Sequence, residues 1–131
     1  MILELPEDPE SKLSIFLRSK KKERSFPIEN YEVEWLRGGF IIYYAYSKDF
    51  KNRDDNTQVF FGHVAGFPIK SDVWYHIKGE VEGNNIRLYV DNNLKLSVYD
   101  HQARLDSGFA GIKVTNFGEV IVDNIRVEEI P

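Results

Sequence analysis

Cysteine is absent from this chain of 131 residues. Without thiols the protein can form neither a disulfide framework nor a thiolate zinc site, and it has no cysteine nucleophile. An excess of positive charge is also missing, because the formal net charge is −4. Proteins that bind nucleic acids usually carry a basic stripe along the phosphates, so we expect no nucleic-acid partner.

Long apolar runs are missing as well. No stretch approaches the roughly 20 apolar residues that a membrane-spanning helix needs. Met1 is followed by a short apolar patch and then by acids, which is not the pattern of a signal peptide. The sequence therefore predicts no membrane span and no signal peptide. Two interpretations follow: a cytoplasmic chain, or a domain cut from a longer secreted chain, which would be extracellular or on the cell surface.

The length and composition are typical of one globular domain. A chain of this length can bury roughly two thirds of the surface that it exposes when unfolded. Hydrophobic residues make up 42% and charged residues 29%, values that fit a packed core. Because no internal repeat, low-complexity tract or linker occurs, we predict a single domain over residues 1–131.

Residues 74–93 carry the clearest pattern, a pair of alternating runs joined by Gly83-Asn84-Asn85. Such alternation predicts a β-hairpin with one face on a core. The predicted inner face holds Ile77, Val81, Ile86, Leu88 and Val90, and the predicted outer face holds His76, Lys78, Glu80, Arg87 and Tyr89. Trp74 is assigned to the core as a large aromatic residue. Gly79 lies in line with the inner residues, which indicates a bulge or a close backbone approach.

Further strands are predicted along the rest of the chain, with turn signals every 8 to 15 residues and no helical pattern between them. The sequence thus predicts an all-β sandwich of two antiparallel sheets. Charged and polar loops are expected at 20–24 and 48–56. The additional strands are expected at 2–5, 12–18, 31–35, 40–47, 57–64, 95–99, 109–114 and 120–128.

A family resemblance adds to this pattern. It rests on the segments Trp74 to Lys78, Gly83 to Asp91, Gly108 to Ile112 and Val122 to Val127. The chain resembles the C-terminal half of concanavalin A-like lectin/glucanase jelly rolls, and is most similar to their LamG-like, carbohydrate-binding and 3-keto-disaccharide hydrolase-like domains. The resemblance covers residues 74–128 well and 31–64 loosely. It implies a jelly-roll-like sandwich that meets ligands on its concave face or at loops along one edge.

Two glutamates, Glu32 and Glu34, are predicted to share one strand face with carboxylates about 6 to 8 Å apart. Glycosidases use carboxyl pairs about 5 to 9.5 Å apart, so a catalytic pair is one interpretation. Glucanases of the resembled superfamily carry E-x-D-x-x-E, whereas Trp35, Leu36 and Arg37 follow Glu34 here. We therefore expect solvent-facing strand carboxylates and keep a catalytic pair as the alternative.

Aromatic residues make up 14% of the chain and cluster in the predicted strands. Sugar rings stack on aromatic planes while their hydroxyls bond polar side chains, so a sugar site needs both on one surface. The predicted ligand-binding residues are Tyr44 and Tyr46, which share a strand face, and His76, Lys78, Arg87 and Tyr89 on the outer face of the hairpin. In the alternative interpretation the tyrosines fill the sandwich interior, with their hydroxyls at its rim.

Metal ligation has weaker support in the sequence, since its three histidines show no ligand spacing. The resemblance implies that Asp123 can join N-terminal acids around a structural calcium, with Glu4 as a partner if the first and last strands are neighbours. Calcium needs six to eight oxygen ligands. An Asp-Asn turn at Asp123 is the alternative.

Together these features favour a non-catalytic, lectin-like module that binds an oligo- or polysaccharide without a required cofactor. Two other interpretations stay open. One is a glycoside hydrolase-like enzyme that uses paired carboxylates, and the other is a structural or assembly domain that associates with other domains or protein chains through a sheet edge.

Overall fold

The computed structural model describes residues 2–3, 12–21, 27–36, 38–49, 52–66, 73–115, 120–121 and 123–129. No helix occurs within these ranges, and therefore none that is long and apolar enough to cross a membrane. The strands are β1 (Ile2–Leu3), β2 (Lys12–Lys21), β3 (Pro27–Leu36), β4 (Gly39–Asp49), β5 (Asn52–Ala65), β6 (Ile77–Glu82), β7 (Asn85–Val90), β8 (Asn93–Tyr99), β9 (Phe109–Thr115) and β10 (Val120–Ile121).

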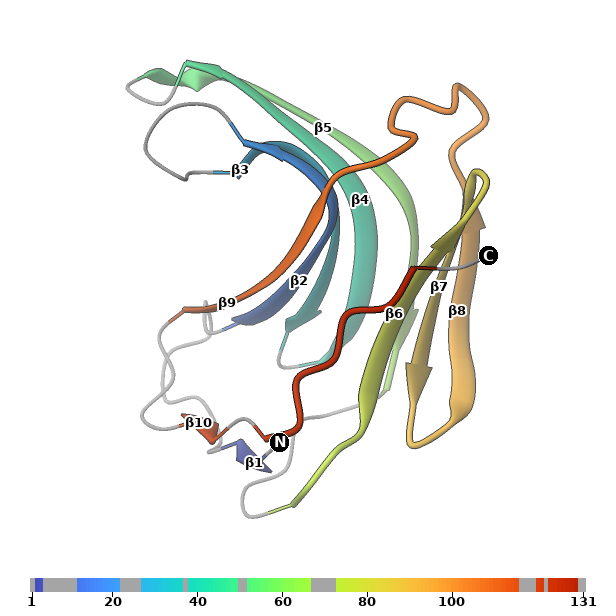
Figure 1. Ribbon diagram of the computed structural model, residues 1–131. Helices are drawn as coiled ribbons and strands as arrows, with labels where there is room; N and C mark the ends of the chain where they lie inside the picture. The colour runs from blue at the N-terminus through green and yellow to red at the C-terminus, as the bar shows by residue number, and fades with distance from the viewer. Residues whose placement is uncertain are drawn as a thin grey trace.

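Two antiparallel sheets form the sandwich (Figure 1). The larger has five strands in the order β5-β4-β3-β2-β9, and the smaller has three in the order β6-β7-β8. The five-stranded sheet is strongly curved, and the three-stranded sheet faces its convex side (Figure 1). The short strands β1 and β10 pair with each other. The predicted all-β sandwich of two antiparallel sheets is thus confirmed.

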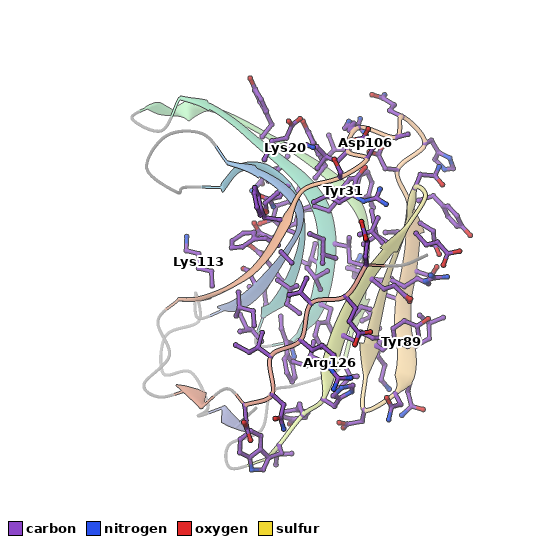
Figure 2. All side chains as sticks on the ribbon, in the orientation of Figure 1. Lys20, Tyr31, Tyr89, Asp106, Lys113 and Arg126 are labelled. Atoms are coloured by element: carbon purple, nitrogen blue, oxygen red, sulfur yellow. The ribbon has the colours of Figure 1, made fainter. Side chains whose placement is uncertain are left out.

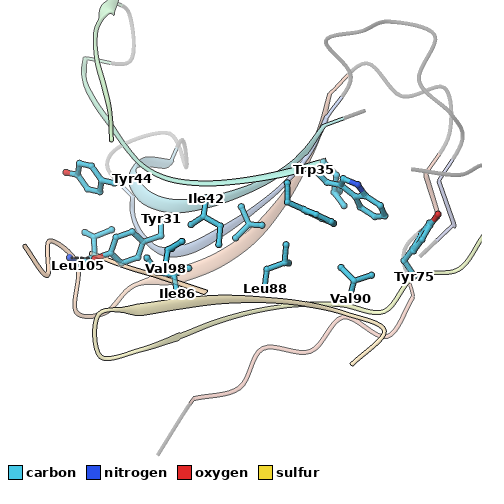
Figure 3. Close-up of a cluster of buried hydrophobic side chains, with 13 residues drawn as sticks. Tyr31, Trp35, Ile42, Tyr44, Tyr75, Ile86, Leu88, Val90, Val98 and Leu105 are labelled. Atoms are coloured by element: carbon cyan, nitrogen blue, oxygen red, sulfur yellow. Dashed lines mark hydrogen bonds between the residues drawn. The ribbon is translucent and has the colours of Figure 1, made fainter. Parts of the chain in front are cut away.

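The core lies between the two sheets and follows from the alternation of the strands (Figure 3). From β7 it receives Ile86, Leu88 and Val90, as the hairpin pattern predicts. Trp35 stacks on Phe40 at 4.8 Å between ring centroids, which closes one end of the core. Burial of these large apolar side chains is the main stabilising contribution to the fold.

Gly79 marks a close approach between the sheets. A Cβ atom at this position would lie 3.2 Å from a methyl group of Leu17 on β2. The β6–β7 register runs without a shift, so the glycine serves packing and not a bulge. The hairpin turns at Gly83 and Asn84, with φ of 61° at Gly83, a conformation that glycine adopts without steric cost.

The structure corrects the prediction that Trp74 belongs to the core. Its side chain is 50% exposed, whereas the neighbouring Tyr75 is buried with its ring 4.8 Å from that of Trp35. Tyr75 lies two residues before Ile77 and Trp74 two residues before His76, so the alternation of the hairpin, continued toward the N-terminus, places Tyr75 inside and Trp74 outside. The assignment of Trp74 to the core departed from that alternation, and the structure follows the alternation.

The structure also corrects the predicted bounds of three segments. The expected polar loop at 48–56 lies largely within strands, because β4 and β5 continue until Asp49 pairs with Asn52. Among the described residues of the expected strand 120–128, Val120–Ile121 is strand, whereas residues 123–129 have no regular structure. Of the expected loop 20–24, residues 20 and 21 belong to β2, and the remainder lies outside the described residues.

A buried carboxylate fixes the connection between β8 and β9. Asp100 is fully buried, and it accepts hydrogen bonds from the backbone N–H groups of Gln102 and Arg104 at 3.1 and 2.9 Å. The Arg104 guanidinium forms an ion pair with the same carboxylate. Hydrogen bonds from several donors compensate for the burial of a charge, so this connection is held rigidly against the sheet edge.

Candidate functional site

The concave face of the five-stranded sheet is lined by two cross-strand rows. Both rows follow directly from the registers of the paired strands. We call them the Glu32 row and the Glu34 row. Because Tyr31 and Val33 of β3 point into the core, Glu32 and Glu34 point to the opposite, concave face. The Glu32 row is Gly111–Phe16–Glu32–Tyr43–Phe60, and the Glu34 row is Lys113–Ser14–Glu34–Ile41–His63.

Glu32 and Glu34 are buried in the middle of these rows, which corrects the expectation that they face solvent. Their exposed fractions are only 8% and 7%. The cross-strand neighbours of Glu32 are Phe16 and Tyr43, whose large side chains share its face. Strand alternation alone indicates which face a carboxylate occupies, whereas its burial depends on what the adjacent strands place beside it.

The hydroxyl of Tyr43 lies between the two carboxylates. It contacts Oε2 of Glu32 and is 2.5 Å from Oε1 of Glu34. The two carboxylate oxygens are therefore no more than about 5 Å apart, closer than the spacing expected along a strand. A phenol has a single hydrogen, so both contacts are hydrogen bonds only when one carboxyl group also carries a proton.

Electrostatics keep the Tyr43 phenol in its neutral form. Burial raises the pKa of Tyr43 far above its usual range, and the negative charge of Glu32 and the hydrogen bonds to both glutamates raise it further. The centre of the concave face thus holds a neutral phenol whose single hydrogen is directed to the two glutamates. Carboxylate oxygens can each accept more than one hydrogen bond, so the two acids are the groups of this cluster that could bond the hydroxyls of a polar ligand.

Accessible groups lie toward the two edges of the concave face. Phe60 on β5 is 65% exposed, and its ring centroid lies 5.7 Å from that of Tyr43. His63 on the same strand is exposed, and so is Lys113 on β9, which extends over the concave side (Figure 2). An exposed aromatic ring therefore neighbours a buried polar cluster on a single surface.

The outer face of the hairpin gathers four of the predicted ligand-binding residues. His76 and Lys78 are exposed, and Arg87 and Tyr89 are partly exposed, as the alternation predicts. These groups engage one another, however. The Lys78 ammonium lies 4.3 Å from the centroid of the Tyr89 ring, where a cation–π interaction covers the aromatic plane.

The remaining polar groups of this face are paired as well. Arg87 bridges two acids, with Nε 3.2 Å from Glu80 and Nη2 3.0 Å from Glu82. The hydrogen bond with Glu82 leads the influences that raise the pKa of Arg87. Glu80 and Glu82 of β6 thus belong to a local ion-pair network at the surface, which contributes little to stability.

Tyr44 and Tyr46 do not lie on either of these surfaces. Tyr44 belongs to the core cluster, and Tyr46 is partly buried against it. The Tyr44 hydroxyl reaches Glu29, and burial raises the pKa of this phenol, followed by the effect of that hydrogen bond. The positions of Tyr44 and Tyr46 match the alternative interpretation, in which the tyrosines fill the interior and their hydroxyls lie at its rim.

Of the two acids predicted to bind calcium, Asp123 and Glu4, the structure describes only Asp123. The first and last strands are neighbours, with Ile2 opposite Ile121, which is the arrangement that the prediction required. Asp123 is exposed and accepts a hydrogen bond of 2.8 Å from the N–H of Asn124, and no turn is formed at these two residues. Glu4 lies outside the described residues. Within the described part of the chain, no group of three metal-ligating side chains occurs.

The residues that sequence reasoning missed are Phe16, Tyr43, Phe60 and Lys113. Each belongs to an alternating strand, so the period-2 pattern could assign it to one face of its own strand. Their grouping with Glu32 and Glu34 depends on the order and register of five strands, which the local pattern does not contain. Comparisons of the chain with protein-family models, with curated proteins and with solved structures found no match.

Proposed function

We propose that this domain is a non-catalytic carbohydrate-binding module with its sugar site on the concave face of the five-stranded sheet. The observation that carries the proposal is the Glu32 row, in which the exposed ring of Phe60 neighbours Tyr43, and the hydroxyl of Tyr43 contacts the Glu32 carboxylate. Aromatic planes stack on the C–H faces of sugars, and adjacent oxygens accept hydrogen bonds from sugar hydroxyls.

The concave face suits this function better than the outer face of the hairpin. On the outer face, Lys78 covers the ring of Tyr89, and Arg87 is engaged by two acids. On the concave face the Phe60 ring is largely exposed, and Lys113 and His63 add exposed polar groups on either side of the glutamates. The resemblance of residues 74–128 to concanavalin A-like domains supports the same class of ligand, and the concave face is one of the two places for a ligand that it implies.

The test is binding of the purified domain to a glycan array, followed by calorimetry with the best oligosaccharide. Phe60→Ala removes the exposed stacking ring, and we expect at least a tenfold loss of affinity, since stacked aromatic contacts contribute about 0.5–1.5 kcal/mol beyond the area that they bury. Tyr99→Ala is the matched control, because Tyr99 is 53% exposed on β8 of the other sheet.

Two results would contradict the proposal. Wild-type protein that binds no glycan on plant, microbial and host arrays would remove the carbohydrate-binding function. Binding that survives Phe60→Ala unchanged but is lost in Tyr89→Ala would move the site to the outer face of the hairpin. A folded state for each variant, checked by its circular dichroism spectrum, is required for either conclusion.

A second candidate function is glycoside cleavage by Glu32 and Glu34. It is favoured by one observation, the contact of both carboxyl groups with the same hydroxyl, which places their oxygens no more than about 5 Å apart. Retaining glycosidases use carboxyl groups about 5 to 5.5 Å apart, one as the nucleophile and the other as the acid and base. Turnover of aryl glycosides that both Glu32→Gln and Glu34→Gln abolish would establish the enzyme, and turnover unchanged in both variants would exclude these residues.

A further inference from the structure

A third row of side chains crosses the concave face next to the Glu32 row. It begins at Phe109 on β9, which lies two residues before Gly111 of the Glu32 row and therefore on the same face. We call it the Asn30 row, and in strand order it is Phe109–Ser19–Asn30–Ala45–Gln58. The sugar contacts proposed above involve only the Glu32 and Glu34 rows, so this row has no assigned role.

A β-bulge brings Ser19 into this row. Between Leu17 and Lys20, β2 has two residues where β3 has only Asn30. The first of the two, Arg18, adopts a positive φ of 52°. The second, Ser19, pairs with β9 on the concave face and lies across from Asn30.

Two buried polar groups in the middle of the Asn30 row have no hydrogen-bond partner. Ser19 and Asn30 are only 3% and 2% exposed, and neither Oγ of Ser19 nor Nδ2 of Asn30 is hydrogen-bonded within the described part of the chain. An apolar occupant of this face would leave both groups unpaired, which costs free energy. A hydroxyl group that reaches them can instead accept from the Asn30 amide and donate to Ser19. The row therefore favours a ligand that carries hydroxyl groups.

Exposed aromatic side chains lie at both edges of the concave face. Phe60 on β5 is 65% exposed, and Phe109 on β9 is 62% exposed. β5 and β9 are the outer strands of the five-stranded sheet, so four interstrand spacings, about 19 Å along the sheet, separate them. A single sugar ring can therefore contact one of these two side chains but not both.

We propose that the concave face binds an oligosaccharide that extends from Phe109 across the Asn30 and Glu32 rows to Phe60. This inference rests on the proposed carbohydrate-binding function and specifies the class of its ligand. Each aromatic ring stacks on a sugar unit at one edge of the sheet, and the polar groups of the two rows meet the hydroxyls of the units between them. A monosaccharide is a poor ligand for such a site, because it contacts one ring at a time.

The test is calorimetry with the unbranched oligosaccharide series of the glycan that binds best on the array, from its monosaccharide to its hexasaccharide. For the wild type we expect the affinity to rise with chain length until the ligand contacts both rings, and then to level off. Phe109→Ala is expected to weaken binding of the hexasaccharide about tenfold. The affinity for the monosaccharide should stay within about twofold of the wild type, because Phe60 remains available to it.

A matched control comes from the same strand. Ile112→Ala removes an exposed apolar side chain of β9 that lies on the opposite face of the sheet, across from Ile15, and should leave binding unchanged. Phe109→Leu removes the aromatic ring but keeps an apolar side chain, so it replaces Phe109→Ala if that variant does not fold. Circular dichroism spectra establish the folded state of each variant.

The outcomes separate this inference from the proposed function. A domain that binds no glycan on the arrays removes both together. The inference alone is overturned if the monosaccharide binds as tightly as the hexasaccharide, or if folded Phe109→Ala binds the hexasaccharide as the wild type does. It is also overturned if sedimentation velocity shows a wild-type dimer that Phe109→Ala abolishes, because the ring would then contact a second copy of the chain.

Discussion

The hydroxyl of Tyr31 donates a hydrogen bond of 2.7 Å to Oδ2 of Asp100, and both residues are fully buried. Tyr31 lies in the middle of the five-stranded sheet, and Asp100 follows the last strand of the three-stranded sheet. The same hydroxyl accepts a hydrogen bond of 3.2 Å from the N–H of Leu105. This pair therefore joins the two sheets and the connection between β8 and β9.

Removal of that hydroxyl should measurably destabilise the domain. Tyr31→Phe leaves a buried carboxylate with one donor fewer and a buried N–H without its acceptor, and each unsatisfied buried group costs about 1–3 kcal/mol. We expect a loss in that range in the free energy of unfolding from urea titrations. Tyr99→Phe, at an exposed position, should change it by less than about 0.5 kcal/mol, and equal effects of the two variants would contradict this role.

The stability of the domain should also fall in acid through Asp100. Burial raises the pKa of this carboxyl, but the hydrogen bonds from the Arg104 N–H, the Tyr31 hydroxyl and the Gln102 N–H outweigh it, and the net pKa lies below its usual value. A depressed pKa in the folded state contributes stability that is complete above the unfolded value of about 3.9 and is lost as the pH falls below it.

Asp100→Asn isolates this contribution from that of the other acids. The variant is expected to be less stable than the wild type at neutral pH, because an amide cannot replace the charge beside Arg104. The difference between the two proteins should narrow as the pH falls below about 4, in urea titrations at a series of pH values. A constant difference over this range would contradict the lowered pKa.

In alkali the buried tyrosines should also lower the stability of the domain, because their pKa values are raised and not lowered in the folded state. Burial and then the hydrogen bond with Asp100 raise the pKa of Tyr31 to about 12, and burial raises the pKa of Tyr43 as well. A raised pKa in the folded state contributes stability that is complete below the unfolded value of about 10 and is lost as the pH rises toward the folded value. Unfolding free energies should therefore decline above about pH 10, and less steeply in Tyr31→Phe.

The cluster on the concave face can be tested by a double-mutant cycle. Tyr43→Phe, Glu34→Gln and the double variant together measure the coupling between the hydroxyl and the carboxyl group. For residues in direct contact we expect a coupling free energy of about 0.5–3 kcal/mol in urea unfolding. Effects that add within about 0.5 kcal/mol would show that the contact contributes no stability.

Arg18 should anchor the hairpin turn and the β8–β9 connection to β2. Its Nη1 atom donates to the carbonyls of Gly83 at 2.6 Å and Leu105 at 2.9 Å, and its backbone adopts a φ of 52°. Arg18→Ala is expected to cost about 1.5–3 kcal/mol in unfolding free energy. Arg18→Gly should cost less, because glycine adopts a positive φ readily. Arg126→Ala, which removes an exposed ion pair with Glu128, is the control.

The sequence by itself determined most of the strands, the inner face of the hairpin and the hairpin turn. Side chains alternate along a strand with a period of two, so the inward positions of Ile86, Leu88 and Val90 can be read from local pattern. Gly83 marks the turn because few other residues adopt its backbone conformation. The same alternation placed Glu32 and Glu34 together on one face of a strand.

Only the tertiary structure decided what surrounds those side chains. Sheet order and register are set by contacts between residues far apart in the chain, so no local pattern could place Phe16, Tyr43 and Phe60 in one row with Glu32. The curvature of the five-stranded sheet made this row part of its concave face. Burial likewise depends on neighbours from other strands, which is why two acids expected in solvent lie beside a buried phenol.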